Sequence, residues 1–97
     1  MCGRYQLLQP HDVTPRFATV NQLELLPPNA DVRPTQLAPV VLMDRRVDLL
    51  RWGLIPSWAK DPRIGAQLIN ARAETVAQKP SFRTPLRLSR CLIPASG

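Results

Sequence analysis

Residues 37–52 read LAPVVLMDRRVDLLRW, and no other part of the chain carries so clear a structural signal. Residues 37–43 are apolar with valines at their centre, which favours an extended strand. The charged residues 44–46 separate two apolar runs, which is typical of a turn. Residues 47–52 then return to an apolar pattern. We therefore predict a β-hairpin with strands over 37–43 and 47–52.

The segments around this hairpin predict further short elements. Thr14-Pro15 is a typical helix start, with Thr14 as the N-cap and Pro15 at the first helical position, and we expect this helix to end near Leu26. The other expected elements are a strand over 3–8, a turn over 28–34, a loop over 52–58, a buried strand over 68–71, a helical turn over 72–77, a turn capped by Ser81 and a last strand over 90–95.

Chain length and proline content limit the fold further. With 97 residues the chain can form one small domain with a modest core. Its eleven prolines exclude long helices and favour short strands, turns and irregular connections. We find no internal repeat, low-complexity tract or linker.

The charge balance points toward nucleic acid. Thirteen Lys and Arg against seven Asp and Glu give a net charge of +6, and most of the cations are arginine. Arginine binds phosphate through two parallel hydrogen bonds and stacks on bases. If all six surplus charges met phosphates of a single strand, log K against log salt would slope by about −4.

Few residues are available to bind a metal or to form disulfides. Cys2, Cys91 and His11 cannot supply four zinc ligands without carboxylates, so we expect no metal. Low cysteine use suits a reducing cytosol. No apolar leader and no run of eighteen apolar residues occurs. The sequence therefore predicts a cytoplasmic protein without a membrane span.

Cys2 follows Met1 directly, within MCGRY at residues 1–5. Removal of Met1 would give Cys2 a free α-amine and a thiol on adjacent carbons. The amine can condense with an aldehyde, and the thiol can then close on the imine carbon to form a five-membered ring. Both groups are partly in their nucleophilic form near neutral pH. By position alone, the alternative is a small buried hydrophobe at the start of a strand.

Six sequence blocks occur in an order that resembles a known family. They are CGRY at 2–5, PTQ at 34–36, RWGLIPSW at 51–58, LINARAET at 68–75, KPSFR at 79–83 and RCLIPA at 90–95. Together they closely resemble the SRAP family, the abasic-site processing proteins also called SOS response-associated peptidases. The resemblance extends from residue 2 to residue 97, and the ordered set is far more specific than any single block.

The resemblance implies a particular chemistry at Cys2. In this family Met1 is lost, and the exposed cysteine forms a thiazolidine with the aldehyde of a ring-opened abasic site in single-stranded DNA. The family's cysteine aligns with Cys2, and its asparagine near the reacting centre aligns with Asn70. The resemblance therefore implies catalytic roles for both residues, a DNA partner with abasic sites, and no cofactor. Without the motif, Asn70 would be a turn or strand-end asparagine whose buried amide needs hydrogen-bond partners.

The resemblance also implies residues that bind DNA. Three arginines that grip the backbone, and a proline and a tryptophan that wedge against bases, align with Arg4, Arg72, Arg83, Pro34 and Trp58. Base–aromatic stacking contributes about 1–3 kcal/mol, which suits Trp58. The residues alone leave Trp58 open as a core tryptophan, and Arg72 as a solvated side chain or an ion pair with Glu74.

Three other residues are assigned structural or solvated positions. Trp52 lies within an apolar run and fits a core position better than Trp58 does. His11 lies in a polar segment and is expected to be solvated. Cys91 precedes two apolar residues and is expected to fill the core.

The expected fold is α+β. The resemblance implies a single α+β unit with short helices and a barrel-like mixed sheet, in proteins about twice this length. Residues 1–97 are therefore expected to form one incomplete domain of this family, with open sheet edges and an exposed apolar face. The family's glutamate and histidine, which assist proton transfer, have no counterpart here. Asp31 and Arg33 also replace an asparagine and a small apolar residue, and Arg33 would offset the weaker DNA binding that Asp31 implies.

The sequence leaves three functions open. The first is covalent capture of abasic sites through Cys2, in the DNA damage and SOS response, by an enzyme of peptidase or lyase type. The second is a self-processing peptidase that removes its own Met1. The third is an inactive fragment that binds single strands weakly.

Overall fold

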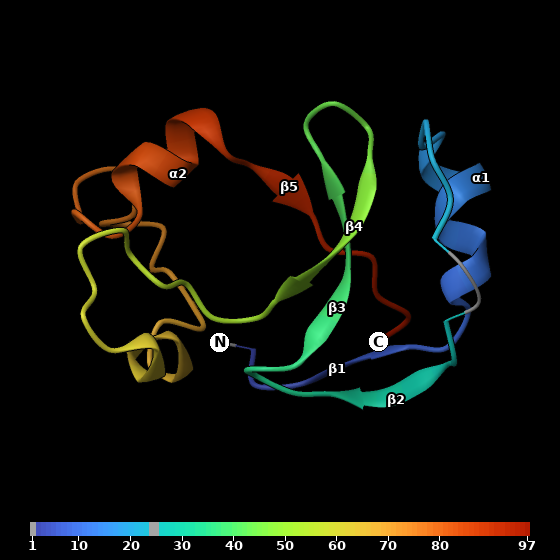
Figure 1. The fold of residues 1–97 in the computed structure, drawn as a ribbon, viewed down its shortest axis with the longest axis horizontal. Coiled ribbons are helices and arrows are strands. Elements are labelled where there is room, and N and C mark those ends of the chain that lie inside the picture. The colour runs from blue at the N-terminus through green and yellow to red at the C-terminus, as the bar shows by residue number, and fades with distance from the viewer. Residues whose placement is uncertain (1, 24–25) are drawn as a thin grey trace.

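The computed structural model describes residues 2–23 and 26–97 and has an α+β fold (Figure 1). The α+β class predicted from the sequence is thus confirmed. All strand pairs among the described residues are antiparallel, in a two-stranded sheet β1-β2 and a three-stranded sheet β4-β3-β5. The elements are β1 (Tyr5–Leu7), η1 (Pro10–Asp12), α1 (Val13–Phe17), β2 (Asn29–Val32), β3 (Leu37–Leu42), β4 (Val47–Arg51), η2 (Pro62–Ala66), α2 (Arg83–Leu88) and β5 (Cys91–Leu92).

The predicted hairpin is confirmed as β3 and β4. The two strands pair from Leu37 opposite Arg51 to Val41 opposite Val47. The turn closes because Arg45 adopts a left-handed conformation with φ of 64° and donates its N–H to the Leu42 carbonyl at 2.9 Å. Strand β3 is therefore the central strand of the larger sheet, with β4 on one side and β5 on the other.

A small valine cluster forms the core beside this hairpin. Val13 of α1 packs with Val41 and Val47, and the partly buried Phe17 and Leu23 pack against them. Burial of each valine contributes about 1.5–3 kcal/mol, so this cluster holds the N-terminal helix on the sheet.

Asn21 fastens the segment after α1 to the same sheet. Its amide donates to the Val47 carbonyl at 2.9 Å, and its side-chain oxygen accepts from the Val47 N–H at 2.8 Å. The pair satisfies both backbone groups of a residue on the outer strand β4.

The predicted helix from Thr14 to Leu26 is much shorter in the structure. Asp12, rather than Thr14, stands at the N-cap of α1, and the helix ends where Ala18 turns left-handed with φ of 51°. This turn lets Val20 donate its N–H to the Arg45 carbonyl at 2.9 Å, so tertiary pairing replaces further helical turns. Residues 24 and 25 of the predicted helix lie outside the described residues.

The turn predicted over residues 28–34 is wrong, because most of this segment forms strand β2. β2 pairs with β1, placing Val32 opposite Tyr5. Val32 is 2% exposed, the most buried side chain among the described residues. Its burial favours an extended chain despite the turn-forming residues around it.

The C-terminal expectations are met in part. The strand predicted over residues 68–71 is wrong, because these residues form no strand in the structure. The helical turn predicted after them is confirmed, since the N–H groups of Thr75 and Val76 both donate to the Arg72 carbonyl. Ser81 does not cap α2, whose N-cap is Phe82 without a side-chain bond. The last strand is limited to β5, but Gln6 of β1 then bonds to Ser96 and Gly97 at 2.6 and 2.7 Å.

Cys91 is exposed, and its predicted role as a core residue is wrong. It lies in β5, where it borders an open cavity and not the valine cluster. Leu92 and Ile93 are likewise 57% and 58% exposed. His11 is exposed, as predicted. Within residues 2–23 and 26–97 no helix is long and apolar enough to cross a membrane.

Candidate functional site

Cys2 and Asn70 lie together, although 68 residues separate them in the chain. The Asn70 side-chain amide donates to the Cys2 carbonyl at 2.8 Å. The Cys2 thiol is exposed and lies 3.3 Å from the Arg4 carbonyl oxygen, to which it donates. The sequence predicts that the Asn70 amide needs a hydrogen-bond partner, and the Cys2 backbone carbonyl is that partner.

Asn70 reaches Cys2 because the chain after β4 folds back closely on itself. Gly53 has φ of 122°, and a Cβ at this position would overlap the Gly65 carbonyl oxygen, so glycine is required. The Leu54 N–H donates to the Leu68 carbonyl at 3.0 Å. The Trp52 indole N–H donates to the Ile69 carbonyl at 2.9 Å. These contacts fix the backbone immediately before Asn70.

Trp52 is therefore half-buried and bonded rather than packed within the valine cluster. Its ring lies 5.7 Å from the Tyr5 ring, centroid to centroid, at an interplanar angle of 53°. Burial, with a smaller contribution from the nearby Cys2, raises the pKa of Tyr5 above its usual value. The phenol thus stays protonated beside the cysteine at neutral pH. No local sequence pattern places Tyr5 beside Cys2, because residues three positions apart in a strand lie on opposite faces.

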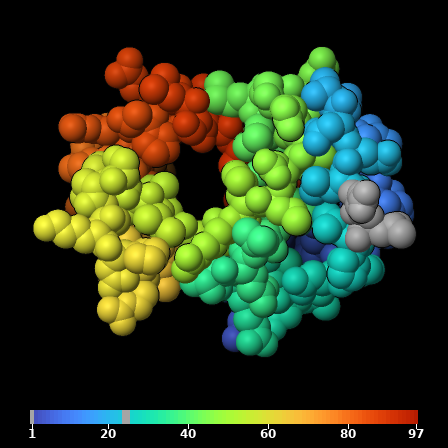
Figure 2. All heavy atoms as spheres, viewed as in Figure 1, coloured from blue at the N-terminus to red at the C-terminus, as the bar shows by residue number. Residues whose placement is uncertain are grey.

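A cavity of about 600 Å³ opens beside Cys2. Figure 2 shows this face hollowed between the strands β3 and β4 and the segments that follow residue 52. Its wall includes Cys2, Tyr5, Trp52 and Asn70, and the remaining described residues of the wall are mostly aliphatic. The thiol therefore borders a largely apolar hollow.

The predicted DNA-binding arginines all lie at the surface. Arg4 is 64% exposed and follows Cys2 by two residues, Arg72 follows Asn70 by two residues, and Arg83 begins α2. Arg72 does not extend a strand beyond Asn70, because the chain there enters a turn. Among the described residues, none of these arginines lines the cavity, so they stay predictions for the surrounding surface.

Pro34 occupies a tight turn between β2 and β3. The Gln36 N–H donates to the Arg33 carbonyl at 3.2 Å, and Thr35 has φ of 73°, which is rare for a β-branched residue. Two backbone bonds between this turn and Trp52 hold it in place. Pro34 at the second position and a positive φ at the third are typical of a type II turn.

Trp58 is 60% exposed, in a turn closed by a bond from the Ala59 N–H to the Pro56 carbonyl at 2.9 Å. The alternative of a core tryptophan is therefore wrong. Its predicted stacking on DNA bases stays a prediction.

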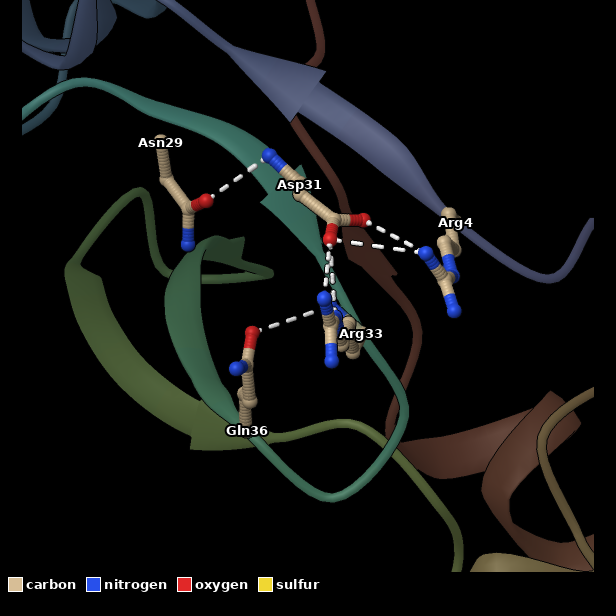
Figure 3. A network of polar contacts seen from close by, with 5 residues as sticks. All are labelled: Arg4, Asn29, Asp31, Arg33 and Gln36. Atoms are coloured by element: carbon tan, nitrogen blue, oxygen red, sulfur yellow. Dashed lines mark hydrogen bonds and ion pairs between the residues drawn. The ribbon is translucent and has the colours of Figure 1, made fainter.

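Asp31 joins Arg4 and Arg33 in a surface ion-pair network (Figure 3). The Arg33 Nε donates to Asp31 at 2.8 Å, whereas the nearest Arg4 nitrogen lies 3.5 Å from the carboxylate. The sequence predicts that Arg33 offsets Asp31, but not that Asp31 also contacts Arg4. Alternation along paired strands is the signal that could have shown it.

The comparisons with known proteins agree with the sequence resemblance. A family model described as SOS response associated peptidase (SRAP) matches residues 1–97. The chain is 46% identical over 103 residues to abasic site processing protein YoqW of Bacillus subtilis, covering 98% of this chain and 45% of that protein. It is 41% identical over 58 residues to abasic site processing protein HMCES of Mus musculus, covering 56% of this chain and 16% of that protein.

Two solved structures share the fold. A protein from Bacteroides thetaiotaomicron superimposes with a TM-score of 0.85 at 26% identity, covering 99% of this chain and 47% of that one. A protein from Bordetella bronchiseptica gives a TM-score of 0.70 at 25% identity, covering 97% and 48%. The chain thus spans just under half the length of these proteins and of the Bacillus relative.

Proposed function

Because this chain belongs to the SOS response associated peptidase (SRAP) family, we propose that it captures abasic sites in single-stranded DNA through a covalent bond to Cys2. The relatives are named abasic site processing proteins, which supports the substrate class. The chain spans under half the length of the Bacillus relative. We therefore argue the activity from the residues that this chain itself contains.

The proposed reaction balances without a cofactor. Hydrolysis first removes Met1 and frees the Cys2 α-amine. The amine nitrogen attacks the aldehyde carbon of the ring-opened abasic sugar, and water leaves to give an imine. The thiol sulfur then adds to the imine carbon, its proton passes to the nitrogen, and a thiazolidine results. Nothing is oxidised or reduced.

The observation that carries this proposal is the contact between Asn70 and Cys2. The amide at 2.8 Å from the Cys2 carbonyl restrains the backbone that bears both nucleophiles. Restraint matters because holding reacting groups in place can lower a barrier by several kcal/mol. An exposed thiol at the second position, beside a hollow and near cationic Arg4, is accessible to a DNA aldehyde.

The electrostatics of the chain support a polyanionic partner. The net charge is +6, and the three predicted DNA-binding arginines are exposed near the ends of the segments that carry Cys2 and Asn70 or at the start of α2. Neutralising phosphates releases counterions, so binding should weaken as salt rises.

A denaturing gel tests the proposal directly. The purified protein is mixed with single-stranded DNA carrying one abasic site, and Cys2→Ala is run in parallel. Cys91→Ala is the matched control, because Cys91 is the other exposed thiol among the described residues. We expect a shifted band with wild type and Cys91→Ala but not with Cys2→Ala. A band that persists in Cys2→Ala, or no band with wild type, would refute the proposal.

The intact mass of the purified protein tests the first step. We expect Met1 to be absent from wild type, because its loss exposes the reacting amine. Retention of Met1 in Asn70→Ala but not in wild type would favour self-processing, whereas its loss from both would favour an ordinary aminopeptidase. A crosslinked product that still carries Met1 would contradict ring formation.

A further inference from the structure

A network of three charged side chains lies at the surface near Cys2. It consists of Arg4, Asp31 and Arg33. The three side chains come from the N-terminal segment and from β2 with the residue after it, and they converge on one carboxylate (Figure 3). Asp31 Oδ2 lies 3.5 Å from Arg4 Nη1 and 2.7 Å from Arg33 Nη2. One carboxylate thus faces two guanidinium groups, leaving a net positive charge.

We propose that Arg4 and Arg33 together bind one phosphate of the DNA backbone, and that Asp31 is the positioning residue that holds the two guanidinium groups for it. This inference rests on the proposed function, since it names the phosphate contact beside the reacting cysteine. It adds Arg33 and Asp31 to the DNA-binding surface.

Both guanidinium groups keep N–H donors that Asp31 does not use, because Arg4 contacts the carboxylate through Nη1 alone. Because both guanidinium groups contact the same Asp31 oxygen, they lie on either side of one carboxylate, and one phosphate could accept a charged hydrogen bond of ~2.8 Å from each. Arg33 uses its Nε and Nη2 on Asp31. A guanidinium has five N–H donors, so the edge with Nη1 remains for another acceptor.

The network is held by the backbone on both sides. The Asp31 N–H donates to the Asn29 side chain at 2.9 Å, and the Arg33 N–H donates to the Gln36 side chain at 3.0 Å. These contacts order the two ends of the segment that carries the charges (Figure 3). Without the carboxylate, the two guanidinium groups would repel each other and separate.

The connection to the reacting centre runs through Arg4. The Arg4 carbonyl accepts the Cys2 thiol hydrogen at 3.3 Å, so the residue that contacts Asp31 also contacts the nucleophile. Arg4 follows Cys2 by two residues, so a phosphate held by Arg4 and Arg33 would be bound by the same short segment that carries the nucleophile.

The test measures binding of the protein to single-stranded DNA without an abasic site, by fluorescence anisotropy across a salt series. This measurement does not require Cys2 chemistry, so it separates the two proposals. The variants are Arg33→Gln, Asp31→Asn and Asp31→Glu. The matched control is Arg46→Gln, which removes the same charge from the exposed hairpin turn. Thermal unfolding confirms that each variant is folded.

We expect Arg33→Gln to weaken binding by about 5- to 10-fold and to reduce the salt slope by about 0.7, the value for one single-strand phosphate. Arg46→Gln should change both quantities much less. Asp31→Asn should weaken binding by about 2- to 3-fold although it adds net positive charge, and Asp31→Glu should restore part of the loss, because a carboxylate again orders the arginines.

Any of three results would overturn the inference. Equal effects of Arg33→Gln and Arg46→Gln would mean that only net charge matters. Binding of Asp31→Asn that equals or exceeds that of wild type would mean that Asp31 does not position the arginines. A wild type that does not bind single strands would also refute it. Binding without crosslinking at abasic sites would instead refute the proposed function alone.

Discussion

Asn70→Ala is the most informative single substitution, because Asn70 contributes one defined contact to the candidate site. The variant removes the hydrogen bond from the side-chain amide to the Cys2 carbonyl, 2.8 Å long in the structure. Asn70 is only half-buried, so water can reach the freed carbonyl.

The expected loss of stability is therefore small. One such hydrogen bond contributes about 0.5–1.5 kcal/mol, and a loss of 1 kcal/mol lowers the unfolding midpoint of a chain this size by about 4–8 °C. The expected loss of activity is larger, since a displacement of about 1 Å at a reacting centre can reduce the rate about 100-fold. We expect crosslinking of abasic DNA to slow by about 10- to 100-fold.

Asn21→Ala is the matched control, because it removes an asparagine of the same chemistry from a structural position. It removes two hydrogen bonds to Val47, at 2.9 and 2.8 Å, and should cost about 2 kcal/mol of stability. Crosslinking rates are measured by gel for both variants below their unfolding midpoints, which calorimetry provides. If Asn70→Ala crosslinks at the wild-type rate, or if both variants slow equally, Asn70 does not act through Cys2.

The remaining predictions concern the surroundings of this contact. Gly53→Ala should lower stability by at least about 1–3 kcal/mol in denaturant titration, because its φ of 122° and the nearby Gly65 carbonyl exclude a side chain; an unchanged midpoint would contradict this reasoning. Trp58→Ala should weaken binding of single-stranded DNA by about 1–3 kcal/mol with little change in unfolding, since the ring is 60% exposed; equal affinity would remove its stacking role. Burial raises the pKa of Tyr5, so the folded state holds its proton more tightly and the free energy of unfolding should fall as pH rises above about 10. Tyr5→Phe should remove the contribution of Tyr5 to this decrease in the free energy of unfolding, measured by denaturation at several pH values. Identical pH profiles for the variant and the wild type would argue against a buried phenol.

Local patterns predicted the elements that depend on neighbouring residues. The hairpin of β3 and β4 follows from two apolar runs around a charged turn, and both strands form as expected. The same reasoning was wrong for β2, whose turn-forming sequence becomes a strand because Val32 is buried against β1. It was also wrong for the end of α1, where a left-handed Ala18 redirects the chain toward the hairpin turn.

The residues of the candidate site could be predicted from the sequence, but their contacts could not. The order of six sequence blocks identified the family, and with it Cys2 and Asn70 as a pair. Periodicity alone would have placed Asn70 in a strand, but the structure places it in a coil after a close approach of Gly53 to Gly65. A contact of this kind depends on segments that are distant in sequence, so no local pattern reports it.

The sequence by itself determined the chemistry that this chain can offer: a cysteine directly behind Met1, an arginine-rich surface charge and the ordered motifs of one family. The tertiary structure decided which of those groups meet. It brought Asn70 to the Cys2 backbone, left Cys91 exposed in β5 and drew Arg4 and Arg33 onto Asp31. The physical reason is that composition and motifs are properties of single residues and short segments. Contacts between distant residues arise only when burial and hydrogen bonding select one folded arrangement of the whole chain.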